Sequence, residues 1–184
     1  MTTAAVLLAA GGGTRFRGVA HKLLTDLQGR PVYEHALAAA QAAGLDEVVV
    51  VVGAVPLELP AGVTVLRNNR WAEGQATSVH IAVEHAAGAG HDAVVVGLAD
   101  QPFVESEAWR AVAAADGPIV VATYDGRRGN PVRLRRDVWP LLAIDGDEGA
   151  RTLMRSRPEL VREVACPGDP ADIDTVEDLQ RWNS

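Results

Sequence analysis

Five consecutive valines at residues 48–52 constrain the fold of this chain more than any other feature. An uninterrupted apolar run of this length is typical of a strand that is covered on both faces. Residues 4–10 and 93–98 form similar runs, and Ala-rich helical stretches such as residues 31–43 lie between them. Strands that alternate with helices indicate βαβ units, so we expect an α/β fold with a mostly parallel sheet between two helical layers.

The remaining elements follow the same alternation. We expect further strands at residues 63–66, 118–123 and 160–165, an extended segment at 124–134, and helices at 77–87, 105–115, 137–143, 148–156 and 175–182. Thr77 or Ser78 is the expected N-cap of the first of these helices. No internal repeat or linker interrupts the pattern, so a single Rossmann-like domain is expected over residues 1–184.

Charge, hydropathy and cysteine content limit the kinds of partner and the compartment that we expect for this protein. The net charge of −7 argues against nucleic acid, whose binding depends on neutralising phosphates with basic residues. No apolar run approaches the roughly 20 residues that a membrane helix needs. The single Cys166 cannot form an internal disulfide, and the N-terminus lacks the basic start of a signal peptide. We therefore expect a cytoplasmic protein with neither a nucleic-acid nor a membrane partner.

A glycine-rich loop follows the first expected strand. Gly11, Gly12 and Gly13 allow backbone N–H groups to approach phosphate oxygens, and Arg15 and Lys22 supply positive charge. The Walker A spacing is absent, and a dinucleotide fingerprint fits poorly because no helix opens directly at Gly13. The alternative interpretation is a tight turn flanked by ordinary surface cations.

Two aspartates and one polar segment complete the candidate site. Asp100 follows the strand at residues 93–98, where ligands bind in open α/β sheets. Asp174 is the natural second ligand for Mg²⁺, although Asp172 or Asp174 also suits the N-cap of the last helix. Residues 74–78, whose sequence is GQATS, open a helix and offer polar groups to an anion, although capping explains Thr77 or Ser78 equally well.

These segments together resemble the molybdenum cofactor nucleotidyltransferases. The chain carries LAAGGGTRFRGVAHKLL, GQATSV, ADQP, GNPV, GDEGAR and DIDTVEDL, in the order of that family and across nearly the whole length. The pattern is most similar to the cytidylyltransferase branch, MocA-like, of the MobA-like NTP transferases. The resemblance implies a nucleotide-diphospho-sugar transferase-like fold and Mg²⁺-dependent transfer of CMP from CTP to the terminal phosphate of molybdopterin.

The resemblance also assigns roles to residues. It implies that Arg15 and Lys22 grip the phosphates and that Asp100 and Asp174 bind the metal. The residues implied to bind the nucleotide are Leu8, Ala9, Ala10, Gly11, Gly12, Gly13, Gly74, Gln75, Thr77 and Ser78. Asn130 and Arg151 are the implied acceptor-binding residues, with a turn and an exposed helical arginine as the alternatives. LAAG at residues 8–11 favours CTP over GTP, and a molybdoenzyme or its chaperone is a possible protein partner.

Three departures from the family pattern bear on the acceptor. Arg15 and Lys22 are two residues further apart than usual, Ala99 replaces a glycine, and Phe16 and Arg17 replace a common Met-Gly pair. Arg17 either adds a phosphate contact or faces water. A sugar- or polyol-phosphate acceptor therefore stays open as an alternative, as do a nucleotide sensor without turnover and, more distantly, a Rossmann dehydrogenase.

Overall fold

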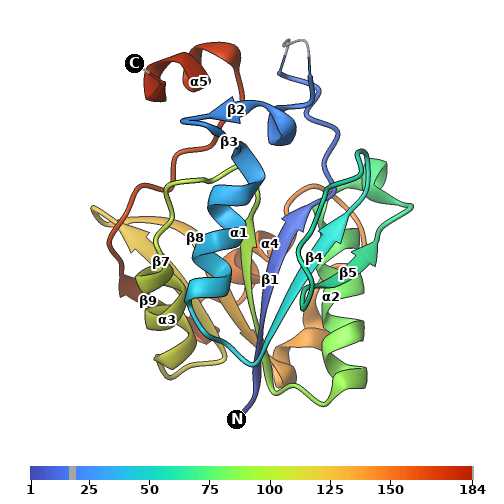
Figure 1. Cartoon of the computed structure of the whole chain (residues 1–184). Coiled ribbons are helices and arrows are strands. Elements are labelled where there is room, and N and C mark those ends of the chain that lie inside the picture. Colours follow the sequence, from blue (N-terminus) through green and yellow to red (C-terminus); the bar gives the residue numbers. More distant parts are fainter. Residues whose placement is uncertain (17–19, 184) are drawn as a thin grey trace.

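A seven-stranded sheet forms the centre of the computed structural model, which describes residues 1–16 and 20–183 (Figure 1). Its strand order is β5-β4-β1-β6-β8-β7-β9. The strands are β1 (Thr3–Ala9), β4 (Glu47–Val52), β5 (Thr64–Arg67), β6 (Ala93–Leu98), β7 (Ile119–Tyr124), β8 (Arg127–Arg135) and β9 (Val161–Ala165). Only β8 runs antiparallel to its two neighbours, so the expected mostly parallel α/β fold is confirmed.

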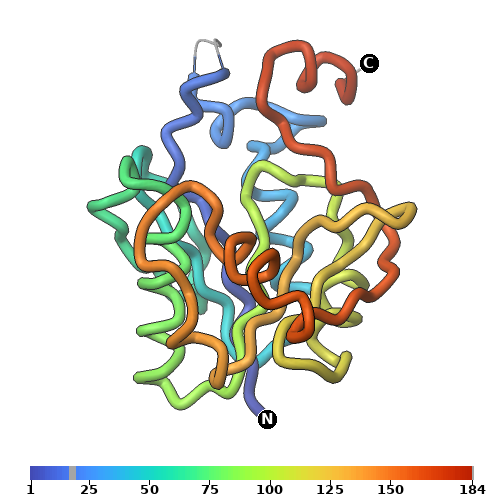
Figure 2. The backbone as a smooth tube through the Cα atoms, turned by 180° about the vertical axis from the view of Figure 1, so that it is seen from behind, coloured from blue at the N-terminus to red at the C-terminus, as the bar shows by residue number. Residues whose placement is uncertain are grey.

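Helices cover both faces of this sheet, as Figures 1 and 2 show. Successive residues of a strand point to opposite faces. Ala5, Leu7 and Ala9 of β1 therefore pack with α1 (Val32–Ala42) and α3 (Ser106–Ala114). The alternate residues of β1 pack with α2 (Gln75–Ala89) and α4 (Arg151–Ser156). This two-sided burial explains why the central strands read as continuous apolar runs.

A small third cluster joins the two ends of the chain. A two-stranded sheet, β2 (Asp26–Leu27) and β3 (Arg30–Pro31), lies below the last helix, α5 (Val176–Trp182) (Figure 1). Leu27, Val32, Ile173 and Leu179 form the buried contact between them. The segment before α5 is thereby held close to the glycine-rich loop. The remaining short 3-10 helices are η1 (Lys22–Leu24), η2 (Trp71–Glu73), η3 (Arg136–Leu141) and η4 (Pro158–Leu160).

Two of the expected helix caps are wrong. Helix α2 begins at Gln75 with Gly74 as its N-cap, so Thr77 and Ser78 lie inside the first turn. Helix α5 is capped by Thr175, whose hydroxyl accepts from the Asp178 amide while the Asp178 carboxylate accepts from the Thr175 amide. This reciprocal pair satisfies two amides at once, which frees Asp172 and Asp174 from capping.

The strand order places the crevice of the sheet beside β1. After β1 the chain adds β4 and β5 on one side of β1 and then places β6 on its other side. The direction of strand addition therefore reverses between β1 and β6. In open α/β sheets ligands bind at such a point, beyond the carboxyl ends of the strands. Among the residues that the structure describes, no helix is long and apolar enough to cross a membrane.

Candidate active site

The glycine-rich loop leaves β1 in a conformation that its glycines permit. Gly13 has a φ of 59°, and the Phe16 amide donates a 2.9 Å hydrogen bond to its carbonyl oxygen. A Cβ atom at Gly12 would lie 2.8 Å from the Trp71 ring, so the indole packs directly on the loop. His21 Nε2 lies 3.0 Å from the Gly11 carbonyl oxygen and ties the loop to η1.

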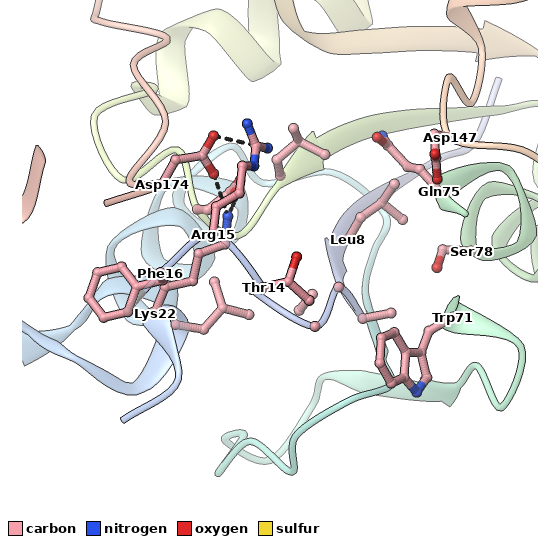
Figure 3. Close-up of a pocket in the computed structure, with 18 of the residues that line it drawn as sticks. Leu8, Thr14, Arg15, Phe16, Lys22, Trp71, Gln75, Ser78, Asp147 and Asp174 are labelled. Atoms are coloured by element: carbon pink, nitrogen blue, oxygen red, sulfur yellow. Dashed lines mark hydrogen bonds and ion pairs between the residues drawn. The ribbon is translucent and has the colours of Figure 1, made fainter. Parts of the chain in front are cut away.

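This loop forms the floor of a cavity of about 530 Å³, which is within the usual range for small-molecule sites. Figure 3 shows Arg15, Lys22 and Asp174 on one side of it and Trp71, Gln75, Ser78 and Asp147 on the other. The nucleotide-binding candidates that line it are Leu8, Ala9, Ala10, Gly11, Gly12, Gly13, Gly74, Gln75 and Ser78, together with Arg15, Lys22, Asp100 and Asp174. The structure thus brings three distant segments of the sequence to one place.

Lys22 connects the two candidate metal ligands. Its Nζ atom donates hydrogen bonds of 2.6 Å to Asp100 Oδ2 and 2.8 Å to Asp174 Oδ1. Burial disfavours the charged ammonium, but the charge and hydrogen bonds of the two carboxylates outweigh burial and raise the pKa of Lys22. The Arg15 guanidinium reaches the other oxygen of Asp174 at 3.0 Å, from a side chain that is 79% exposed.

The Asp172–Asp174 segment is fixed by backbone and side-chain contacts. The Ile173 amide donates a 2.8 Å hydrogen bond to the Asp100 carbonyl oxygen. Asp172 accepts 2.7 Å from Gln101 Nε2, and burial together with the negative charge of Asp100 raises the pKa of Asp172. A carboxylate therefore lies on each side of Ile173, and only Asp174 lines the large cavity.

These residues fit a divalent cation such as Mg²⁺. Asp100 and Asp174 each place an oxygen within 2.8 Å of the same Nζ atom, so two carboxylates converge on one position. Mg²⁺ is usually held by one or two carboxylates, with substrate phosphates and water completing its shell. Among the described residues no group of three or more acidic, His or Cys side chains is arranged as a self-sufficient metal site. That arrangement suits a metal that is shared with a bound phosphate.

Thr77 does not line the cavity, in contrast to its neighbours. It is buried, and its hydroxyl donates 2.8 Å to the Gly74 carbonyl oxygen and accepts 2.8 Å from Asn68 Nδ2. The same Asn68 amide donates 2.8 Å to Ser78 Oγ. Thr77 thus anchors the first turn of α2 instead of facing a ligand, and Asn68 is a positioning residue that the sequence motifs did not reveal.

Asp147 is a cavity residue that the sequence reasoning missed. Its loop packs tightly on the start of α2, because the Gly146 carbonyl oxygen accepts 2.9 Å from the Ala76 amide. Gly74 has a φ of 113°, and a Cβ there would lie 2.3 Å from the Gly146 backbone. The two glycines of separate motifs thus meet, and no local sequence pattern signals this contact.

The implied acceptor residues Asn130 and Arg151 line a second, smaller cavity of about 220 Å³. It lies between α2, α4 and the sheet, and Gln75 borders both cavities. Asn130 donates 3.0 Å to Gln101 Oε1, so it is held next to the residue that follows Asp100. The described structure shows no hydrogen bond or ion pair for the Arg151 guanidinium.

Two departures from the family pattern have a structural outcome. Ala99 is buried, and its amide donates 3.0 Å to the Leu8 carbonyl oxygen, so the methyl group fits beside Asp100. The wider spacing from Arg15 to Lys22 still brings both cations to Asp174. The expectation for Arg17 lies outside the described residues.

The fold is shared with solved nucleotidyltransferases, and the fold and a family model together identify this chain as a member of that superfamily. A model of the MobA-like NTP transferase domain matches residues 5–162, and the chain belongs to that family. The resemblance drawn from the motifs is confirmed at this level.

Matches to curated relatives cover nearly the whole chain. Nicotine blue oxidoreductase of Paenarthrobacter nicotinovorans is 32% identical, and the match covers 96% of this chain and 94% of the relative. Purine catabolism protein PucB of Bacillus subtilis is 31% identical, with 94% and 92% covered. The crystal structure of Rv0371c from Mycobacterium tuberculosis is similar with a TM-score of 0.82 and 28% identity, covering 100% and 98%, and a second structure of that protein is a complex with manganese.

Proposed function

We propose that this protein transfers CMP from CTP to the terminal phosphate of a molybdopterin-type cofactor and releases pyrophosphate, in a Mg²⁺-dependent reaction. The observation that carries the proposal is the convergence of Asp100, Asp174 and Lys22 at the end of the glycine-rich loop. Carboxylates for a cation and an ammonium for phosphate at one point are the parts that phosphoryl-type transfer requires.

The residues of the large cavity bind and orient the triphosphate. The backbone of Gly11 to Gly13 accommodates phosphate oxygens, and Lys22 and Arg15 neutralise the β- and γ-phosphates. Asp100 and Asp174 would hold Mg²⁺, which supplies charge stabilisation at the α-phosphate when bound. An oxygen of the acceptor phosphate forms a bond to the α-phosphorus as the bond to the β-phosphate oxygen breaks, and pyrophosphate leaves with that electron pair. The nucleophile is already an anion, so positioning and charge supply most of the rate.

The base and the acceptor occupy neighbouring cavities in this proposal. Trp71 presents an aromatic wall beside Gly12, and Gln75 and Ser78 offer hydrogen-bonding groups to a base. The acceptor lies in the second cavity, with Asn130 and Arg151 at its edge and Gln75 between it and the nucleotide. CTP is proposed because residues 8–11 read LAAG, the form that favours cytosine in the resemblance.

One relative suggests a different activity. The match to the relative named nicotine blue oxidoreductase covers nearly the whole chain, so an oxidoreductase is the second candidate. The two carboxylates that share Lys22 favour transfer, because a cation held beside a triphosphate stabilises the charge that develops in nucleotidyl transfer. An inositol-1-phosphate CTP transferase from T. maritima shares the fold at 14% identity, and so a polyol-phosphate acceptor belongs in the same test.

The test is a matrix of nucleotides and acceptors. CTP, GTP, ATP and UTP are each combined with molybdopterin, inositol 1-phosphate and sugar 1-phosphates, with Mg²⁺ or Mn²⁺, and pyrophosphate is measured. NADH and NADPH are tested in parallel for binding and for oxidation with a quinoid acceptor dye. Pyrophosphate release with CTP and molybdopterin above all other pairs supports the proposal. Oxidation of a nicotinamide without pyrophosphate release from any pair replaces it with the second candidate.

A variant pair then tests the acceptor cavity. Met154→Trp places a larger side chain in the second cavity and so reduces the space for the acceptor. It should raise the KM for the acceptor while leaving the KM for CTP unchanged. Leu141→Trp, at an exposed residue of η3, is the matched control with no expected effect. Equal acceptor KM values for both variants would place the acceptor elsewhere.

A further inference from the structure

Lys22 is the only lysine of the chain, in which the other 16 of the 17 basic residues are arginines. An ammonium is a compact charge with three donors, whereas a guanidinium is a planar fork. A small cation fits between two carboxylates that converge on one point. The sole lysine therefore lies between Asp100 and Asp174, where its ammonium group forms ion pairs with both carboxylates.

The bridge is largely shielded from solvent. The side chain of Lys22 is 12% exposed, and those of Asp100 and Asp174 are 19% and 22% exposed. The Lys22 Nζ atom lies where the two carboxylates converge, which is where a cation held by both of them would bind. We infer that Lys22 holds the place of the divalent cation in the nucleotide-free protein, and that metal and triphosphate consequently bind as one coupled event.

Charge balance explains the coupling. A metal that binds alone must displace the Lys22 ammonium from both carboxylates and leave it partly buried with no anionic partner, which is unfavourable. A triphosphate offers that partner, because Lys22 lines the same cavity as Gly11 to Gly13. Once Lys22 turns to the phosphates, Asp100 and Asp174 are free for the metal. By linkage, each ligand then raises the affinity of the other by the same factor.

Arg15 cannot serve in the same way. It contacts a single oxygen of Asp174, at 3.0 Å, and among the described residues it forms no ion pair with Asp100. Its side chain is 79% exposed, so water screens its charge. Removing Arg15 therefore lowers the positive charge near the site but leaves Lys22 between the two carboxylates. The Arg15 variant is thus the control for a purely electrostatic effect.

The inference rests on the proposed function only in taking Asp100 and Asp174 as the metal ligands. Its test measures Mn²⁺ binding by electron paramagnetic resonance, with and without a CTP analogue whose α–β bridge is a methylene group. Wild type, Lys22→Met, Arg15→Met and Arg162→Met are compared, and Arg162 is an exposed residue of β9 that controls for net charge. Asp100→Asn is included as the ligand variant.

The expected result is weak Mn²⁺ binding to wild type alone and binding that is tighter by about 10-fold or more with the analogue, within the usual range of coupling between sites. Lys22→Met should bind Mn²⁺ alone about 10-fold more tightly than wild type, and its further gain from the analogue, which still supplies phosphate oxygens to the metal, should be smaller than that of wild type. Arg162→Met should match wild type, and Arg15→Met should show a smaller gain than Lys22→Met. Equal gains for Arg15→Met and Lys22→Met, or none for either, would overturn the inference.

Selective ¹⁵N labelling of lysine gives a second readout, because the chain has one Nζ atom. Its resonance should shift strongly when Mg²⁺ and the analogue are added together and little when Mg²⁺ is added alone. A full shift with Mg²⁺ alone would contradict coupled binding. Mn²⁺ binding that Asp100→Asn leaves unchanged would instead remove the metal ligands of the proposed function, so the two failures are distinguishable.

Discussion

The amide of Ile173 donates a 2.8 Å hydrogen bond to the carbonyl oxygen of Asp100. This contact joins the turn after β6 to the segment before α5. Ile173 itself is fully buried against Leu27 and Leu179, so the link is supported by packing. The position of Asp174 next to Asp100 therefore depends on the C-terminal helix.

Replacing either aspartate with asparagine should abolish most of the transfer. Asp100→Asn and Asp174→Asn each remove one negative charge from the point where the cation is expected, and we predict a fall in kcat of at least about 100-fold, as for other charge-stabilising groups. Circular dichroism should show an unchanged fold. Asp125→Asn, in an exposed turn with a φ of 49° that asparagine tolerates, should retain full activity. Near-normal turnover in the Asp100 variant would remove that residue from the mechanism.

The contact between Gly74 and Gly146 predicts a sharp difference between two glycine variants. Gly74→Ala places a methyl group 2.3 Å from the Gly146 backbone at a φ of 113°, and should cost about 1–3 kcal/mol and displace the loop that carries Asp147. Gly88→Ala lies inside α2 with open space around it and should stabilise the protein by about 0.5–1 kcal/mol. Denaturant unfolding measures both values. A Gly74 variant as stable as wild type would mean that the loop does not dock on α2 as described.

Thr77 should affect stability and not ligand affinity. Thr77→Val leaves the Asn68 amide with one fewer acceptor in a buried site, and we predict a loss of about 1–3 kcal/mol in the free energy of unfolding. The Kd of CTP should stay within twofold of wild type. A large rise in Kd with unchanged stability would restore Thr77 to the nucleotide site.

Some parts of the fold and of the candidate site can be predicted from the sequence, and others cannot. The sequences of β1, β4 and β6 are continuous apolar runs because both faces of these strands are buried. The strands and their parallel arrangement could therefore be predicted from the sequence. Lys22, Asp100 and Asp174 were predicted from a loop after a strand, a carboxylate after a strand and a segment before a helix, and the structure places all three in one cavity. Thr77 was wrong as an N-cap because α2 begins at Gln75, and its hydroxyl pairs with Asn68, a contact between separate segments that no local pattern encodes. Asp147 was missed for the same reason, since its place depends on two glycines meeting.

A pH dependence of stability is expected from Glu47, at the start of β4. Burial alone would raise the pKa of this carboxyl, but hydrogen bonds with Thr64, His85 and His91 outweigh burial and lower it. A carboxyl with a lowered pKa in the folded state contributes stability above its unfolded pKa of about 4.3 and loses it as the pH falls through the folded pKa.

Glu47→Gln should therefore lower Tm at pH 7 and flatten the decline of Tm on the acid side. Thermal unfolding of both proteins from pH 3 to pH 7 measures this effect. Curves that run parallel over the whole range would show that Glu47 is not the residue responsible.

The most direct measurement follows the α-phosphate. CTP labelled with ³²P at the α-position is incubated with the protein, Mg²⁺ and molybdopterin, and the label and pyrophosphate are quantified together. The account predicts that the label moves to the acceptor in a 1:1 ratio with pyrophosphate and that Asp100→Asn stops both. CTP that binds without losing pyrophosphate, with molybdopterin and with every sugar or polyol phosphate, would contradict it.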